Sequence, residues 1–352
     1  MVWGWLGRER GSSIGSGRGG IILSPSLAAA FAQVPREVFV PDGFQRRDGT
    51  WAKPADPDFL EIVYSDDVLV TKVDGRTPVS SSSQPSLMAL MIETLDVRPG
   101  MTVLEIGAGT GYNAALLATM GARVISIDVQ EDVVERARAA VARAGVTGVR
   151  VELGDGYAGR PDEQVDRVIV TVGVAGVSPR WQTPIVAPVE HAGTHPVLKI
   201  SPGYAARVVT PAGFMIAAGP LTAAHPFPTP APPGALKNLH PYGESRFDPP
   251  LEPLAYRDLW YAAGVWNRRA TLAAVPGREQ SCLALLDEDR EGGAIVFPDG
   301  SITASGSRGE EAAAIVDRWL ELGRPPMGAW RIGLAPGGDP DSPILLPHTW
   351  EL

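Results

Sequence analysis

The sequence has a single cysteine, Cys282, so its 352 residues can form no intrachain disulfide and no metal site built on several cysteines. It has no apolar run near the roughly 18 residues that span a membrane, and its N-terminus lacks the apolar stretch of a secretory signal. Basic residues are also few, since 31 Lys and Arg stand against 40 Asp and Glu, and the formal net charge is −9. A nucleic-acid binder needs a net or clustered basic surface. We therefore expect a cytoplasmic protein with neither a nucleic-acid nor a membrane partner.

The chain does contain enough apolar residues for a sizeable core, because 44% of its residues are hydrophobic, and its length favours two domains. The 40 glycines and 33 prolines predict many loops. Composition predicts a flexible lead-in, a first domain, a Pro-rich linker and a second domain, at residues 1–23, 24–222, 223–250 and 251–352 in turn.

Predicted strands and helices alternate in the first domain. Strands are expected at 102–106, 123–127, 149–153 and 165–172, with helices at 24–34, 85–95, 113–120 and 131–144. This order predicts an α/β protein with a parallel sheet and right-handed crossovers. Shorter strands at 185–188, 197–200 and 214–218 would extend the same sheet, and the last hundred residues predict a smaller α+β unit.

The strongest chemical signal is a glycine-rich loop at 107–111, between a predicted strand and a predicted helix. Such a loop lets a ligand approach backbone amides at the helix N-terminus. Glu105 lies in the preceding strand, Asp128 ends the next strand, where it can accept both hydroxyls of a ribose, and Asp155 follows the third. Three acids disfavour a pyrophosphate and favour a cationic ligand with a ribose, such as S-adenosylmethionine. A capping or ion-paired Glu105 is one alternative, and a dinucleotide-binding oxidoreductase, which predicts Gly-x-Gly-x-x-Gly spacing, is another.

Several segments together resemble the protein-L-isoaspartate (D-aspartate) O-methyltransferase family. They are the run 105–112, the triplet Gly154-Asp155-Gly156, the strand 166–171, Ser83-Gln84-Pro85, and the segments 36–41 and 64–69. The similarity covers about residues 24 to 220. It implies a class I, Rossmann-like seven-stranded S-adenosylmethionine-dependent methyltransferase fold. It also implies a methyl ester formed on an Asp or isoaspartate carboxylate of a peptide or protein, with S-adenosyl-L-homocysteine as the product.

The resemblance also implies the site residues. Ser83 would lie at the methyl-transfer centre as the catalytic residue. The cofactor-binding residues would be Ser81, Ser82, Glu105, Gly107, Ala108, Gly109, Gly111, Asp128, Val129, Asp155, Gly156 and Tyr157. No metal is expected: His191 and His195 lie four residues apart, but the intervening Gly193 and the following Pro196 disfavour a helix, so a loop that lines the substrate cleft is favoured over a zinc pair.

These residues suffice for the chemistry because a carboxylate is ionised at neutral pH and needs no general base. The enzyme must place one oxygen in line with the sulfonium methyl, and the Ser83 hydroxyl could donate to the other oxygen. Because the substrate side chain is anionic, we expect local basic residues near the cleft despite the negative net charge.

The biological role has competing interpretations. Residues 251–352 favour the modification of one Asp to an aspartimide in a dedicated ribosomally made peptide, which this domain would recognise. Their deletion should then abolish action on that peptide. The alternatives are general repair of isoaspartate in proteins and a non-catalytic S-adenosylmethionine-binding protein. The oligomeric state stays open.

Overall fold

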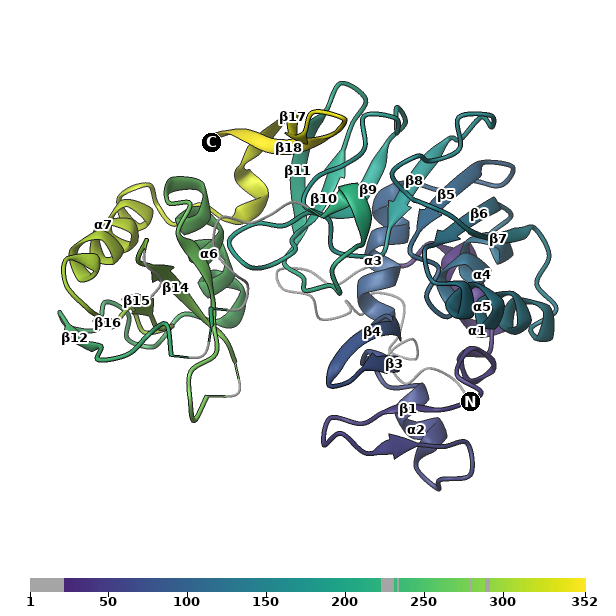
Figure 1. Cartoon of the computed structure of the whole chain (residues 1–352), viewed down its shortest axis with the longest axis horizontal. Helices are drawn as coiled ribbons and strands as arrows, with labels where there is room; N and C mark the ends of the chain where they lie inside the picture. The colour runs from purple at the N-terminus through teal and green to yellow at the C-terminus, as the bar shows by residue number, and fades with distance from the viewer. Residues whose placement is uncertain (1–21, 223–230, 233, 279, 289–291) are drawn as a thin grey trace.

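The computed structural model describes residues 22–352 except 223–230, 233, 279 and 289–291, so most of the predicted lead-in lies outside the described residues. In the view of Figure 1 a large sheet occupies the upper right of the molecule, with a small N-terminal sheet below it and a further small sheet with two helices to its left. No helix among the described residues combines the length and apolarity needed to cross a membrane.

The large sheet has nine strands in the order β18-β17-β11-β10-β9-β8-β5-β6-β7. Their bounds are β5 (Thr102–Ile106), β6 (Arg123–Asp128), β7 (Val149–Leu153), β8 (Arg167–Val170), β9 (Ile185–Pro188), β10 (Val197–Ile200), β11 (Ala205–Thr210), β17 (Arg331–Asp339) and β18 (Ser342–Glu351). Strands β7, β6, β5, β8 and β9 are parallel, and the other four pair antiparallel. The predicted Rossmann-like fold of seven strands is therefore confirmed, and the hairpin β17–β18 extends it.

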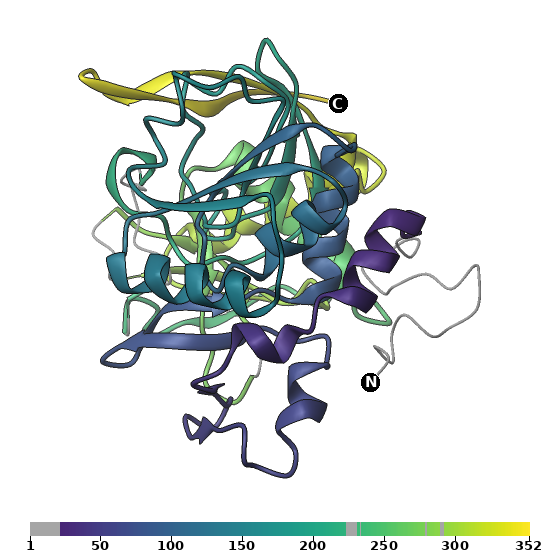
Figure 2. The ribbon, with the colours of Figure 1, turned by 90° about the vertical axis from the view of Figure 1, so that its right-hand side faces the viewer.

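Helices cover one face of this sheet. Because alternate strand residues point to opposite faces, every second apolar strand residue faces these helices. Val103, Val124 and Ile169 share a core with α1 (Pro25–Gln33), α3 (Pro85–Leu95) and α4 (Tyr112–Thr119), while α5 (Glu131–Arg143) packs beside β7 (Figure 2). The predicted helices are confirmed. In α1 the Ser24 hydroxyl caps the first turn by accepting from the N–H of Leu27 at 3.3 Å, and Pro25 takes the first helical position.

A second, four-stranded sheet lies near the N-terminus, where no strands were predicted. It consists of β1 (Phe44–Gln45), β2 (Trp51–Ala52), β3 (Leu69–Asp74) and β4 (Thr77–Ser82), accompanied by the 3-10 turn η1 (Arg36–Phe39) and α2 (Phe59–Val63). Three of the four serines at 80–83 thus belong to a strand. Strands β1 and β2 are too short, and serine has too low a β propensity, for the sequence to predict these strands. Pairing with β3 stabilises β4 as a strand.

The C-terminal module, defined here as residues 240–321, holds the third sheet, in the order β12-β16-β15-β14-β13. Its elements are β12 (His240–Tyr242), α6 (Pro253–Trp266), β13 (Ala270–Ala273), β14 (Cys282–Leu286), β15 (Gly293–Val296), β16 (Ile302–Ala304) and α7 (Arg308–Glu321), and the turns η2 (Gly219–Leu221) and η3 (Met327–Ala329) flank it. Helix α6 was not predicted, because its sequence is apolar on most sides and shows no clear helical period.

The structure differs from the predicted domain boundaries at both ends of this module. Strand β12 lies inside the predicted linker 223–250, much of whose proline-rich part lies outside the described residues. Strands β17 and β18 lie within the predicted second domain 251–352, but they extend the large sheet instead, since β17 pairs with β11 and β18 pairs with β17. The predicted strand at 214–218 is also wrong: only Ile216 forms an isolated bridge, to Gly173, and the strand that pairs with β10 is β11, earlier in the chain.

One apolar cluster joins the module to the other face of the large sheet. It contains Leu104 and Ile125 of the sheet together with Trp260 of α6 and Trp319 of α7. Deleting residues 251–352 would therefore remove two sheet strands and expose this core. The deletion that the sequence suggested is for this reason no clean test of substrate recognition.

Candidate functional site

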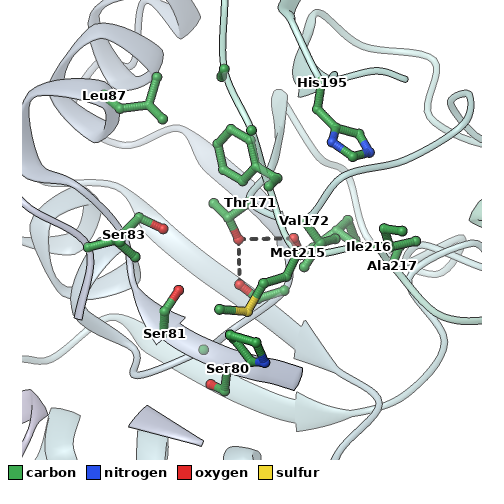
Figure 3. A pocket seen from close by; sticks show the side chains of 18 of the residues that line it. Ser80, Ser81, Ser83, Leu87, Thr171, Val172, His195, Met215, Ile216 and Ala217 are labelled. Atoms are coloured by element: carbon green, nitrogen blue, oxygen red, sulfur yellow. Dashed lines mark hydrogen bonds between the residues drawn. The ribbon is translucent and has the colours of Figure 1, made fainter. Parts of the chain in front are cut away.

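The glycine loop leaves β5 in a backbone conformation that requires glycine. Gly107 has φ +96° and Gly109 has φ +51°, both in the left-handed region. A Cβ atom on Gly107 would lie 2.8 Å from Val172 Cγ1, and one on Gly109 would lie 2.9 Å from the Ser81 carbonyl oxygen. Thr171 Oγ1 donates to the Gly107 carbonyl oxygen at 2.6 Å (Figure 3). The loop is thus wedged between the end of β8 and the end of β4.

A cavity of about 880 Å³ opens beside this loop, near the upper limit of the ~300–1,000 Å³ common for ligand pockets. Ten of the predicted site residues line it: Ser81, Ser82, Ser83, Glu105, Gly107, Ala108, Gly109, Asp128, Val129 and Gly156. Another part of the wall comes from residues 193–196, residues 211–218 and helix α6. The large sheet, the N-terminal sheet and the C-terminal module therefore all contribute to one cavity.

Glu105 is fully buried at the base of the loop. Its carboxylate accepts hydrogen bonds from Asn113 Nδ2 at 2.6 Å and from Ser126 Oγ at 2.5 Å. Burial raises the pKa of Glu105 to about 7, and these two hydrogen bonds act in the opposite direction. The structure thus holds an ionisable acid at the cavity whose charge a bound cation would stabilise.

Asn113 is a site residue that the sequence analysis missed. Its amide donates to Glu105, and its Oδ1 is buried with no hydrogen-bond partner among the described residues. A buried acceptor without a donor is unfavourable by about 1–3 kcal/mol. Because Asn113 also lines the cavity, an ammonium or other cationic donor bound there could satisfy Oδ1 and face Glu105 at once. These acceptors fit a cationic group such as the amino group of S-adenosylmethionine.

Asp128 ends β6 on the other side of the loop. Its carboxylate accepts from the backbone N–H of Gly109 at 3.2 Å and from that of Gln130 at 3.1 Å. These contacts fix the carboxylate at the cavity, and the side chain is only half-buried. Val129 beside it is 49% exposed, which leaves an apolar surface on which a flat ring could lie.

Consecutive serines at the end of β4 and directly after it point in alternate directions. Figure 3 shows the side chains of Ser81 and Ser83 directed toward the cavity. The Ser82 hydroxyl instead accepts from Nε of Arg36 at 3.3 Å, in the interior. Arg36 is fully buried, and its Nη2 donates to the Ser83 carbonyl oxygen at 2.9 Å. A buried guanidinium therefore fixes the backbone that presents Ser83.

Three predicted cofactor residues lie outside the cavity lining. Gly111 caps α4 and packs against Ala137 of α5. Asp155 is exposed and its Oδ1 accepts from the N–H of Tyr157 at 2.9 Å. The Tyr157 hydroxyl donates to the Pro343 carbonyl oxygen of β18 at 3.0 Å. These residues shape the loops around the cavity, and the acid at the third strand end does not join the other two.

The two histidines separate. His195 lines the cavity, and burial lowers its pKa to about 4, so that it is neutral at pH 7. His191 stacks on Tyr261 of α6 at a ring-centroid distance of 4.2 Å. Among the described residues, no group of three or more His, Cys, Asp and Glu side chains is placed to hold a metal ion.

The strand order, the glycine loop after β5 and the acid that ends β6 define the class I, Rossmann-like methyltransferase fold. Residues 16–185 match the family model of protein-L-isoaspartate(D-aspartate) O-methyltransferase. The chain is 37% identical over 189 residues to a Methylorubrum extorquens protein-L-isoaspartate O-methyltransferase, covering 51% of this chain and 73% of that one. This chain belongs to the protein-L-isoaspartate O-methyltransferase family.

Other relatives differ in how much of them is matched. A Thermotoga maritima protein-L-isoaspartate O-methyltransferase is 40% identical over 165 residues, which is 46% of this chain and 47% of the relative. This chain thus spans about half the length of that curated relative. A solved structure of a protein-L-isoaspartate O-methyltransferase superposes with a TM-score of 0.51 at 26% identity and covers 88% of this chain and 92% of that one. This coverage is more than the large sheet and the N-terminal sheet can supply, so the structural match extends into the C-terminal module.

Proposed function

We propose that this protein is an S-adenosylmethionine-dependent carboxyl O-methyltransferase that acts on isoaspartyl residues of proteins, in general repair. The observation that carries the proposal is one cavity with two facing sets of groups. Glu105, Asn113 and Asp128 offer acceptors to a cation with a ribose, and Ser83 offers a neutral hydroxyl. Family membership supports the same chemistry.

The proposed roles follow from the chemistry of each group. S-adenosylmethionine supplies an electrophilic methyl group on a sulfonium when it is bound. Glu105 and Asn113 would hold its amino group, and Asp128 would accept its ribose hydroxyls. Ala108, Val129 and Gly156 would bound the remainder through their apolar surface.

The reacting carboxylate needs no base, because its reference pKa of about 4 leaves it ionised at neutral pH. Ser83 would donate to the oxygen that does not attack and so fix the rotation of the carboxylate. His195 is uncharged at pH 7 and leaves the nucleophile unpaired. The product is a methyl ester, and attack by the following backbone nitrogen then expels methanol and closes a succinimide. Its hydrolysis yields Asp or isoaspartate.

The C-terminal module no longer distinguishes repair from modification of a dedicated peptide. The sequence favoured the dedicated peptide because residues 251–352 would recognise it, whereas general repair gains little from an added recognition surface. A solved protein-L-isoaspartate O-methyltransferase that covers 88% of this chain supports the repair reading instead, since most of the extra part has a counterpart there. The finer assignment to an aspartimide in one peptide therefore has no observation in its favour.

The test compares three peptides that differ at one position, with isoaspartate, Asp or Asn, in a methyl-release assay and by mass spectrometry. We expect one methyl group on the isoaspartyl peptide, followed by loss of methanol, and none on the Asn peptide. Methylation of a dedicated Asp peptide but not of the isoaspartyl peptide would favour the modification role. If calorimetry shows that S-adenosylhomocysteine binds but no peptide is methylated, the protein is a non-catalytic cofactor-binding protein.

A further inference from the structure

Arg257 lies on the cavity wall formed by the C-terminal module. It belongs to α6, and it is the only Lys or Arg among the described residues that line the cavity. The two carboxylates of the lining, Glu105 and Asp128, belong to the large sheet instead. Figure 1 shows α6 in the C-terminal module, to the left of β5 and β6, with β9, β10 and β11 between them. The cavity therefore has an acidic side and a side with a single cation.

The guanidinium of Arg257 lacks an acidic partner in the part of the chain that the structure describes. Among the described residues it forms no ion pair or hydrogen bond. Its guanidinium lies over the Trp260 ring, whose centroid is 4.6 Å from Cζ, and Tyr256 and Cys282 are the titratable side chains near it. The adjacent carboxylate of Asp258 accepts from the Met327 N–H at 2.8 Å. Three other arginines of the module do have acidic partners: Arg246 pairs with Asp317, Arg269 with Glu288, and Arg308 with Asp287 and Glu311.

Such a placement suits an anion supplied from outside the chain. The side chain is half-buried, and desolvation lowers the pKa of Arg257, so the charge is only partly hydrated. Stacking on an aromatic face holds the guanidinium plane without using its N–H donors. Those donors form a planar fork that matches a carboxylate in two parallel hydrogen bonds. Arg257 is thus preorganised for a carboxylate that enters the cavity.

This carboxylate differs from the one that accepts the methyl group. A guanidinium paired with the nucleophile would stabilise its negative charge before reaction and slow the attack, whereas Ser83 is a neutral donor. The cofactor carries a carboxylate of its own, but its cationic groups draw it to the acidic side of the cavity.

We propose that Arg257 binds a second carboxylate of the polypeptide substrate, near the residue that is methylated, and thereby sets a preference for acidic substrates. The carboxylate comes from an acidic side chain or from a free C-terminus, which share this chemistry. The inference rests on the proposed function, because it takes a polypeptide as the occupant of this side of the cavity. It gives the C-terminal module a defined part in substrate selection.

The experiment uses the full-length protein saturated with S-adenosylhomocysteine and N-acetylated peptides with one isoaspartyl residue. Glu is placed at each of three positions on either side of that residue, and every peptide has a Gln counterpart. A further pair has a free or an amidated C-terminus, which separates the two sources of the carboxylate. Peptide dissociation constants come from fluorescence anisotropy, and kcat and KM come from methyl transfer with S-adenosylmethionine.

We expect the wild-type protein to bind one carboxylate-bearing peptide about tenfold more tightly than its neutral counterpart, as a charge-assisted pair provides. R257Q should lose this discrimination, with the change in KM and little change in kcat, and R257K should keep part of it. The control is R318Q, because Arg318 also stacks on a tryptophan, Trp266, at 4.5 Å, but is exposed and lies outside the cavity lining. R318Q should discriminate like the wild type.

Three results would overturn the inference. Wild-type protein that shows no preference for a carboxylate at any position refutes it without any variant. Equal weakening of charged and neutral peptides in R257Q would assign Arg257 to the cavity wall alone. A weaker S-adenosylhomocysteine affinity with unchanged peptide discrimination would assign it to the cofactor. Absence of methyl transfer together with charge-dependent binding would instead refute the proposed function and leave the anion site standing.

Discussion

Replacement of Glu105 by Gln gives a pH-dependent stability that the structure makes quantitative. Glu105 is fully buried, and its pKa is raised from 4.5 to about 7. A difference of this size corresponds to about 3 kcal/mol between the two charge states. The folded protein favours the neutral form. Below pH 4.5 the side chain is neutral in the unfolded chain as well, so its ionisation does not lower the free energy of unfolding. Between pH 4.5 and about 7 the free energy of unfolding falls by about 3 kcal/mol, and above this range it no longer depends on Glu105.

In E105Q this dependence is absent, since an amide does not titrate. Urea unfolding of the cofactor-free protein at several pH values between 5 and 8 measures the free energy of unfolding. We expect the difference between E105Q and the wild type to grow by about 3 kcal/mol across the titration. The test uses the slope of the free energy of unfolding against pH. Gln at position 105 forms different hydrogen bonds with Asn113 and Ser126 than Glu does, but this changes stability by the same amount at every pH.

The control is E135Q, which removes one acid from the exposed face of α5. Its stability curve should run parallel to that of the wild type. If the free energy of unfolding of E105Q also runs parallel to that of the wild type across this pH range, Glu105 does not have the raised pKa that its burial implies. Since a bound cation selects the ionised form, S-adenosylhomocysteine affinity should also fall below about pH 7 in the wild type and stay flat in E105Q.

Three further variants test the remaining parts of the site. D128A should raise the S-adenosylhomocysteine dissociation constant by about 10–100-fold in calorimetry, because a charged acceptor for the ribose is lost. S83A should lower kcat by about tenfold with an unchanged S-adenosylhomocysteine dissociation constant, because its hydroxyl acts on the substrate carboxylate. R36M should lower the free energy of unfolding by about 3 kcal/mol or more, because carbonyl oxygens of Val63, Asp67 and Ser83 lose a buried donor.

Each of these variants has a counterpart. D155A removes an acid outside the cavity lining and should bind S-adenosylhomocysteine nearly as the wild type does, so an equal loss in both would contradict the role of Asp128. A weaker cofactor affinity in S83A at normal kcat would move Ser83 away from the transfer centre. R47M breaks an exposed ion pair with Asp67 and should change stability by less than about 1 kcal/mol. A similarly small loss of stability in R36M would contradict the proposal that Arg36 holds this backbone in place.

The sequence predicts the parallel half of the large sheet well because β5, β6 and β8 are mostly buried apolar strands and α5 has a clear helical period. It predicts Glu105 and Asp128 as cavity residues for a simple reason: parallel strands that end at one edge bring their last side chains together. Asp155 fails this logic, since it lies in the turn after β7 and caps Tyr157 instead. A position at a strand end does not decide where the side chain points.

The remainder depends on contacts between distant residues. Asn113 is one polar residue in an apolar helix, and only its hydrogen bond with Glu105 marks it. Arg257 has no motif, and it becomes informative only when the cavity lining shows it without an acidic partner among the described residues. The pairing of β17 with β11 joins segments more than a hundred residues apart, and no local pattern specifies that register.

This late pairing has a consequence for the order in which the protein forms. The chain leaves the large sheet after Thr210, builds the C-terminal module, and returns at Arg331. During synthesis the edge of β11 therefore stays open, and one side of the apolar cluster uncovered, until the hairpin β17–β18 has emerged from the ribosome. The module and the sheet then close together, as parts of one cooperative unit, and the cavity that lies between them is among the last features to form.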